Sequence, residues 1–116
     1  MNHMLITIAN NGFADAIMEV AKNAGARGGT ILHARGSAKQ DAIQFLGITI
    51  QPEKDVILII VNDEEKNTIM QAISTALGFG TKAHALTISL PVDGMVGISM
   101  DGQEKIEIQK DVETTK

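Results

Sequence analysis

One stretch restricts the possible folds of this chain more than any other: residues 55–61, DVILIIV, are apolar at six of seven positions. An apolar run of this length, rich in Ile and Val, is typical of a strand that is buried on both faces. Alternate residues of a strand point to opposite faces. They form two apolar sets, Val56, Leu58 and Ile60 on one face, and Ile57, Ile59 and Val61 on the other. The sheet that contains this strand therefore needs cover on both sides.

The rest of the chain supplies three further strands and two helices. Strands are predicted at 4–9, 30–35, 55–61 and 83–90, and helices at 13–24 and 62–77. Their order is strand, helix, strand, strand, helix, strand. This order predicts an α+β, ferredoxin-like βαββαβ fold, with an antiparallel four-stranded sheet and both helices on one face.

Each predicted helix has an apolar face and recognisable ends. The apolar positions are Phe13, Ile17, Val20, Ala21 and Ala24 in the first helix, and Ile69, Ile73, Ala76 and Leu77 in the second. Asn11 is the expected N-cap of the first helix, and Gly25 its stop. The second begins with a capping-box variant from Asn62 to Glu65.

Two helices can cover only one face of a four-stranded sheet, so the second apolar face needs a partner. Left in water, it would exceed the few hundred Å² of contiguous apolar surface that monomers usually expose. Another copy of the chain is the simplest cover. The sequence therefore predicts a homo-oligomer.

Length and composition exclude several classes of protein. With 116 residues the chain suits one domain, expected over 1–110, with a small hairpin at 98–108 and a polar tail at 111–116. A net charge of -4, with three Phe as the only aromatic residues, argues against a nucleic-acid partner. The chain has no Cys, and no apolar run approaches the roughly 20 residues of a membrane span. The expected location is the cytoplasm.

Positive charge and glycine gather in one stretch of this acidic chain. Between Gly25 and Gln40 lie Arg27, Arg35 and Lys39, with no acidic residue. If Ser37 caps a helical turn across 38–46, ended by Gly47, the amides of 38–40 would form a nest for a carboxylate or phosphate. A strand between glycine turns, with its charges simply solvated, explains the same residues equally well.

The connection at 37–51 is more apolar than a solvated loop should be. It contains Phe45, Leu46, Ile48 and Ile50, of which the last two alternate with polar residues as in a strand or a hairpin arm. Such a segment either packs on its own core or binds a partner.

No arrangement typical of an enzyme is present. The chain has no Walker A, Rossmann, GxSxG or HExxH motif, and its acidic clusters fall at a helix start and in turns. His33 and His84 lie on strands expected at opposite edges of the sheet, so one subunit cannot join them around a metal. We therefore predict a protein that is not an enzyme, and assign no metal ligand.

Two segments, GARGGTILHARGSAKQ and SLPVDGMVGI, together with the βαββαβ order, resemble the P-II nitrogen-regulatory superfamily. Gly25, Gly28 and Thr30 match that family's Gly-x-x-Gly-x-Thr pattern before the second strand. Gly36 and Gln40 match the ends of its Gly-x-Gly-x-Gln pattern, with Ala38 at the middle glycine. The resemblance covers about 4–98.

The resemblance implies a homotrimer with ligand clefts between subunits and a loop, here 37–51, that docks on a target protein or transporter. It also implies a regulator of nitrogen or related metabolism. The residues expected at the ligand are Gly28, Thr30, Arg35, Gly36, Ser37, Lys39 and Gln40.

This chain departs from the family at its phosphate-binding cations. The run 83–86 is Ala-His-Ala-Leu where nucleotide-binding members have Gly-Asp-Gly-Lys, and Gly97 and Ser99 replace two arginines. An adenine nucleotide stays among the candidate ligands, but tight ATP binding is not expected, and a small anionic metabolite fits better. The alternative is a trimer linked by divalent metal, as in CutA-like proteins, through His33 and His84.

Overall fold

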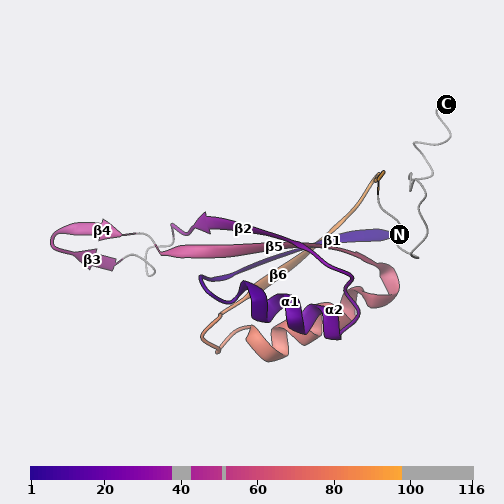
Figure 1. The fold of residues 1–116 in the computed structure, drawn as a ribbon, viewed down its shortest axis with the longest axis horizontal. Coiled ribbons are helices and arrows are strands. Elements are labelled where there is room, and N and C mark those ends of the chain that lie inside the picture. Colours follow the sequence, from indigo (N-terminus) through magenta and orange to yellow (C-terminus); the bar gives the residue numbers. More distant parts are fainter. Residues whose placement is uncertain (38–42, 51, 98–116) are drawn as a thin grey trace.

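The structure is a computed structural model that describes residues 1–37, 43–50 and 52–97. Its elements in chain order are β1 (Asn2–Asn10), α1 (Ala14–Asn23), β2 (Thr30–Arg35), β3 (Ile43–Phe45), β4 (Ile48–Ile50), β5 (Glu53–Asn62), α2 (Asp63–Leu77) and β6 (Leu86–Pro91). The main sheet has the strand order β2-β5-β1-β6, and each neighbouring pair is antiparallel. Both helices lie on one side of this sheet (Figure 1). The α+β class and this sheet are as predicted, and they are compatible with a ferredoxin-like fold.

The core lies between the helices and one face of the two central strands. Along β1 and β5 buried residues alternate with half-buried ones, as the two-residue period of a strand requires. The largest fully buried apolar side chains come from both layers: Leu5, Ile57, Ile59 and Val61 from the sheet, and Ile17, Ile69 and Ile73 from the helices. Full burial of one such side chain is worth roughly 1.5–3 kcal/mol, so this layer holds the fold together.

The opposite face of the sheet is apolar, and neither α1 nor α2 lies over it (Figure 1). Register places ten aliphatic residues there: Met4, Ile6, Ile8, Leu32, Val56, Leu58, Ile60, Leu86, Ile88 and Leu90. Those on β1 and β5 are half-buried by their neighbours, whereas Leu32, Leu86, Ile88 and Leu90 on the edge strands are exposed. We call these ten residues the open face. Its composition agrees with the expectation that the central strand is apolar on both sides.

The two helices begin in different ways. The capping box of α2 is present as predicted, because the Glu65 amide donates to Asn62 Oδ1 at 3.0 Å and the Asn62 amide donates to Glu65 Oε1 at 3.1 Å. The predicted N-cap at Asn11 is wrong, since Phe13 holds that position without a side-chain cap. The carboxylate of Asp55, on β5, accepts a hydrogen bond from the Gly12 amide at 3.0 Å and so holds the turn just before the helix.

Most of the expected helix faces are buried, with one exception. Ile17, Ala21, Ile69 and Ile73 are in the core, but Ala76 is exposed. Ala76 is two helical turns after the buried Ile69 and on the same side of the helix, yet it is exposed, whereas Leu77, one position on, is partly buried.

The helical turn predicted at 38–46 is wrong where the structure describes it. Residues 43–45 and 48–50 form the antiparallel pair β3–β4, with Leu46 and Gly47 at positive φ (51° and 80°) in the turn between them. Two consecutive residues at positive φ suit the turn of a tight hairpin. Residues 38–42 and 51 and the predicted 98–108 hairpin and 111–116 tail lie outside the described residues.

The last strand begins three residues later than the sequence pattern indicates. Ala83 is fully buried and its carbonyl accepts a hydrogen bond from the Asn10 amide at 2.9 Å, but His84 has φ 49°, which breaks the extended backbone. β6 therefore starts at Leu86 and includes Pro91. Within the described residues, neither helix is long and apolar enough to cross a membrane.

Candidate functional site

The predicted anion site centres on the end of β2, where Arg35, Gly36 and Ser37 follow one another. Arg35 is the last residue of the strand and is the Cα partner of Glu53. The Gly36 amide donates to the Pro52 carbonyl oxygen at 2.9 Å, which continues the β2–β5 pairing by one residue. This amide is therefore already bonded, and an anion would have to be held by side chains or by later amides.

A cation that the sequence did not suggest lies beside this strand end. A β-carbon placed on Gly36 would come within 2.8 Å of Lys54 Cε, so the lysine side chain runs directly past the glycine. Lys54 Nζ donates to Asn10 Oδ1 at 2.8 Å. Lys54 and Arg35 thus lie at the same end of two paired strands, but register places them on opposite faces of the sheet, with Glu53 directly opposite Arg35. On the open-face side, the positive charge of Lys54 favours an anion at this strand end.

The two residues expected at the start of β2 are far from this strand end. Thr30 begins β2 and is the Cα partner of Leu58 on the open face, and Gly28 precedes it. At about 3.3 Å per residue, Thr30 and Arg35 are separated by roughly 17 Å along the strand. One subunit therefore does not bring Gly28 and Thr30 together with Arg35, Gly36 and Ser37.

Of the two glycines before β2, the one that packing requires is Gly29, which the sequence did not single out. A β-carbon there would lie 2.8 Å from the Leu58 carbonyl oxygen and 2.9 Å from Met18 Sδ, whereas one on Gly28 would meet nothing within 4 Å. Gly29 permits close packing of the strand start against β5 and α1. Nothing in the sequence indicates which of these two adjacent glycines the packing requires.

The other two cations of the positively charged stretch are Arg27 and Lys39. Arg27 lies before β2, and its Nη1 is 3.5 Å from Glu65 Oε1 at the start of α2, so an acidic partner offsets its charge. Lys39 and Gln40 lie outside the described residues. Their place in an anion nest stays a prediction.

The hairpin β3–β4 carries the residues expected to dock on a partner. Register pairs Phe45 with Ile48 and Ile43 with Ile50, while Gln44 pairs with Thr49. Apolar pairs thus alternate with a polar pair along this short hairpin. Leu46, in its turn, is 86 % exposed. Figure 1 shows the hairpin beyond the ends of β2 and β5, away from both helices.

A second group of polar residues, not assigned from the sequence, lies on the helix-facing side of β2 and β5. The side chain of Asp55 is only 3 % exposed, and its Oδ1 is 3.0 Å from Nδ1 of His33, whose side chain is 80 % exposed. Burial alone would raise the pKa of Asp55, but hydrogen bonds from the Gly12 amide and His33 outweigh it and hold the pKa below its usual value of 3.8. The carboxylate is therefore charged at neutral pH. In the sequence, the one sign of this polar group was an Asp at the start of an otherwise apolar strand.

The two exposed histidines are at opposite edges of the main sheet, as expected. His33 is on β2, while His84 lies in the turn before β6 rather than on the strand. The ring centroid of His84 is 5.6 Å from that of Phe79. In the described part of the chain, no three His, Cys, Asp or Glu side chains converge as a metal cage would require.

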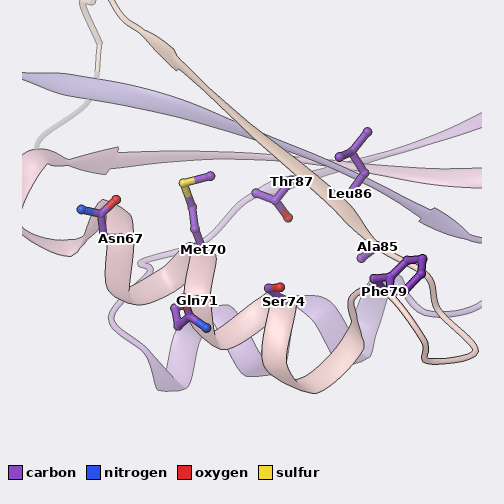
Figure 2. Close-up of a pocket in the computed structure, with 8 residues that line it drawn as sticks. All are labelled: Asn67, Met70, Gln71, Ser74, Phe79, Ala85, Leu86 and Thr87. Carbon is purple, nitrogen blue, oxygen red and sulfur yellow. The ribbon is translucent and has the colours of Figure 1, made fainter.

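A groove of about 490 Å³ lies between α2 and β6. Figure 2 shows Met70 and Ser74 of α2 on one side and Leu86 and Thr87 of β6 on the other, with Phe79 near one end. Its lining residues carry no charge, so nothing there would hold a small anion.

Comparison with known proteins adds no identification. No protein-family model matches the chain, and no curated protein matches its sequence.

Proposed function

We propose that this protein is a non-enzymatic regulator of the P-II type. In this proposal it is a cytoplasmic homotrimer that binds a small anionic metabolite or nucleotide between subunits. It regulates nitrogen or related metabolism by docking the loop 37–51 on a target protein or transporter. The βαββαβ order of the main sheet and the motifs around Gly25–Gln40 support the resemblance from which this proposal starts.

The observation that carries the proposal is the open face. Ten aliphatic residues occupy one side of the sheet, and four of them are exposed on the edge strands β2 and β6. Both described helices are on the other side of the sheet, so neither of them covers these residues (Figure 1). A face of this kind suits assembly with other copies of the chain.

The separation of the expected ligand residues supports a site between subunits. Arg35, Gly36 and Ser37 lie at one end of β2, and Gly28 and Thr30 lie at or before the other. A small molecule cannot span the roughly 17 Å between these groups within one subunit. If both groups contact one ligand, they belong to two copies of the chain.

The hairpin β3–β4 provides the proposed docking element. Its turn residue Leu46 is exposed and costly to leave in water, and a partner surface would offset that cost. Its position beyond the body of the sheet leaves it accessible from several directions (Figure 1).

The metal-linked trimer is the second candidate. Because β2 and β6 are the two edges of the sheet, an ion shared by His33 and His84 would have to join neighbouring subunits. Removal of metal by a chelator would then dissociate the oligomer, whereas a trimer held by the open face would persist.

The proposal is tested by oligomeric state and by ligand response together. Sedimentation at micromolar protein concentration should give a trimer, and a monomer would overturn the proposal. A thermal-shift series with ATP, ADP, 2-oxoglutarate and bicarbonate should identify an anion that raises the melting temperature, since a ligand of the folded state stabilises it. Lys54→Met should reduce that response, while Lys66→Met, on α2, serves as the matched control.

A further inference from the structure

His33 and Asp55 form a hydrogen-bonded pair that has no role in the proposed regulatory function. Asp55 is the first buried residue of β5, next to the turn before α1, and 2 % of the residue is exposed. Its Oδ2 accepts the Gly12 amide at 3.0 Å, and its Oδ1 faces His33 Nδ1 at 3.0 Å. Each carboxylate oxygen therefore has a partner, and the aspartate cannot turn away from the histidine without also losing the bond to Gly12 in the turn before α1.

This arrangement selects one form of the imidazole. A charged carboxylate only accepts hydrogen bonds, so Nδ1 of His33 carries the proton that it donates. In the neutral ring Nε2 then keeps its lone pair. Because the His33 side chain is 80 % exposed, that lone pair is open to a ligand.

A cavity of about 310 Å³ adjoins the pair. Its lining includes Asn11 and Asp15, from the turn before α1 and its first turn, together with His33 and Asp55. These residues offer imidazole, carboxylate and amide groups, and no Lys or Arg is among the lining residues. The local chemistry therefore favours a cation.

We propose that His33 Nε2, oriented by Asp55, binds a divalent transition-metal ion of the Zn²⁺ class in this cavity, with the Asp15 carboxylate as a second ligand. Imidazole and carboxylate are common zinc ligands, and a carboxylate behind a ligating histidine fixes its tautomer and raises its basicity. Hard cations such as Mg²⁺ prefer all-oxygen surroundings and would not select the imidazole.

The site is an open one. No three His, Cys, Asp or Glu side chains converge in the described part of the chain, so water or a bound molecule completes the coordination of the ion. It needs only one subunit and no anion. The inference is therefore independent of the proposed regulatory function, and either can fail while the other stands.

The tautomer is tested first, on the unmodified protein without metal. Two-bond ¹H–¹⁵N NMR at pH 8 should show His33 with its proton on Nδ1, although Nε2–H is the commoner form of a free neutral imidazole. A proton on Nε2 would overturn the proposal, and this measurement does not depend on any variant folding.

Metal binding is then measured by calorimetric titration with ZnCl₂, using protein without a histidine tag. Saturable binding of one ion per chain is expected, unaffected by millimolar MgCl₂. His33→Ala should weaken it at least tenfold and Asp15→Asn severalfold. His84→Ala separates this one-subunit site from an ion shared by His33 and His84 of neighbouring subunits. It should bind as the wild type does, because His84 lies at the other edge of the sheet, and a loss equal to that of His33→Ala would overturn the proposal.

The role of Asp55 as a positioning residue is tested by Asp55→Asn. An outer carboxylate of this kind typically contributes 10–100-fold to metal affinity, so a loss of about tenfold is expected, with a mixed tautomer at His33 in the NMR spectrum. No saturable Zn²⁺ binding by the wild type, or equal binding by His33→Ala, would overturn the proposal.

Discussion

Leu58 and Ile59 are neighbours in β5, yet they belong to opposite sides of the sheet. Ile59 is fully buried beneath the helices, and Leu58 is half-buried on the open face. Consecutive residues of a strand always diverge in this way, so charge placed at the two positions probes two different surfaces. Substitutions at Leu58 and at Ile59 therefore test assembly and folding of the subunit separately.

The first prediction uses this pair. Ile59→Glu should unfold the subunit, because an unpaired charge in the core costs several kcal/mol, a large part of the stability of a small domain. Leu58→Glu should keep the helical circular-dichroism signal but sediment as a monomer. If the Leu58→Glu protein stays fully assembled, the open face is not the contact between subunits.

The second prediction concerns the adjacent glycines before β2. Gly29→Ala should lower the free energy of unfolding by about 1–3 kcal/mol, since its β-carbon would press on the Leu58 carbonyl oxygen at 2.8 Å and on Met18. Gly28→Ala is the matched control and should change stability by less than about 1 kcal/mol, because nothing lies within 4 Å. Urea denaturation measures both. Equal effects at the two positions would show that the close packing is not what matters.

The sequence predicted the main sheet well because its signals there are local and redundant. Residues 56–61 are apolar throughout, and Asn62 and Glu65 form the expected capping box. The prediction from sequence failed where a residue distant along the chain determines the local structure. Asp55 binds the turn before α1 from 43 residues away, and Phe13 rather than the predicted Asn11 is the N-cap.

The candidate site was predictable only in part for the same reason. Glycine and positive charge marked the end of β2, but the contact of Gly36 with Lys54 depends on strand pairing. The Asp55–His33 bond likewise follows from register, which places His33 opposite Asp55. A pattern read along one strand cannot show which residue of the next strand faces it.

The third prediction is a pH dependence of stability. The pKa of Asp55 is below its usual 3.8 in the folded state, so the folded protein holds this proton less tightly than the unfolded chain does. The contribution of Asp55 is therefore complete above about pH 5 and is lost as the pH falls through 3.8 towards the lower folded pKa. Denaturant titrations at pH 7, 5, 4 and 3 should show this decrease.

Asp55→Asn is the comparison for that experiment. The variant should be less stable at pH 7, since the Gly12 amide and His33 lose a charged acceptor. Its stability should also fall less steeply between pH 5 and 3. Identical slopes for the two proteins would mean that other carboxylates account for the acid sensitivity.

The last prediction concerns the hairpin β3–β4. Leu46 is 86 % exposed, so Leu46→Ser removes little buried apolar area from the folded subunit. A double variant with Phe45→Ser removes both apolar residues that the sequence places in the expected contact. The trimer and the melting temperature should stay nearly unchanged. Capture of the target that the wild-type protein retains should be lost, because the exposed apolar turn is the proposed contact.

Phe79→Ser provides the matched control for this loss. Phe79 is 91 % exposed but lies in the turn between α2 and β6, outside the hairpin, so its replacement should leave target capture intact. Equal loss with Phe79→Ser would indicate nonspecific apolar adhesion. If the Phe45 and Leu46 double change instead lowers the free energy of unfolding by more than about 3 kcal/mol, the effect is that of removing core residues, and the hairpin packs on its own trimer.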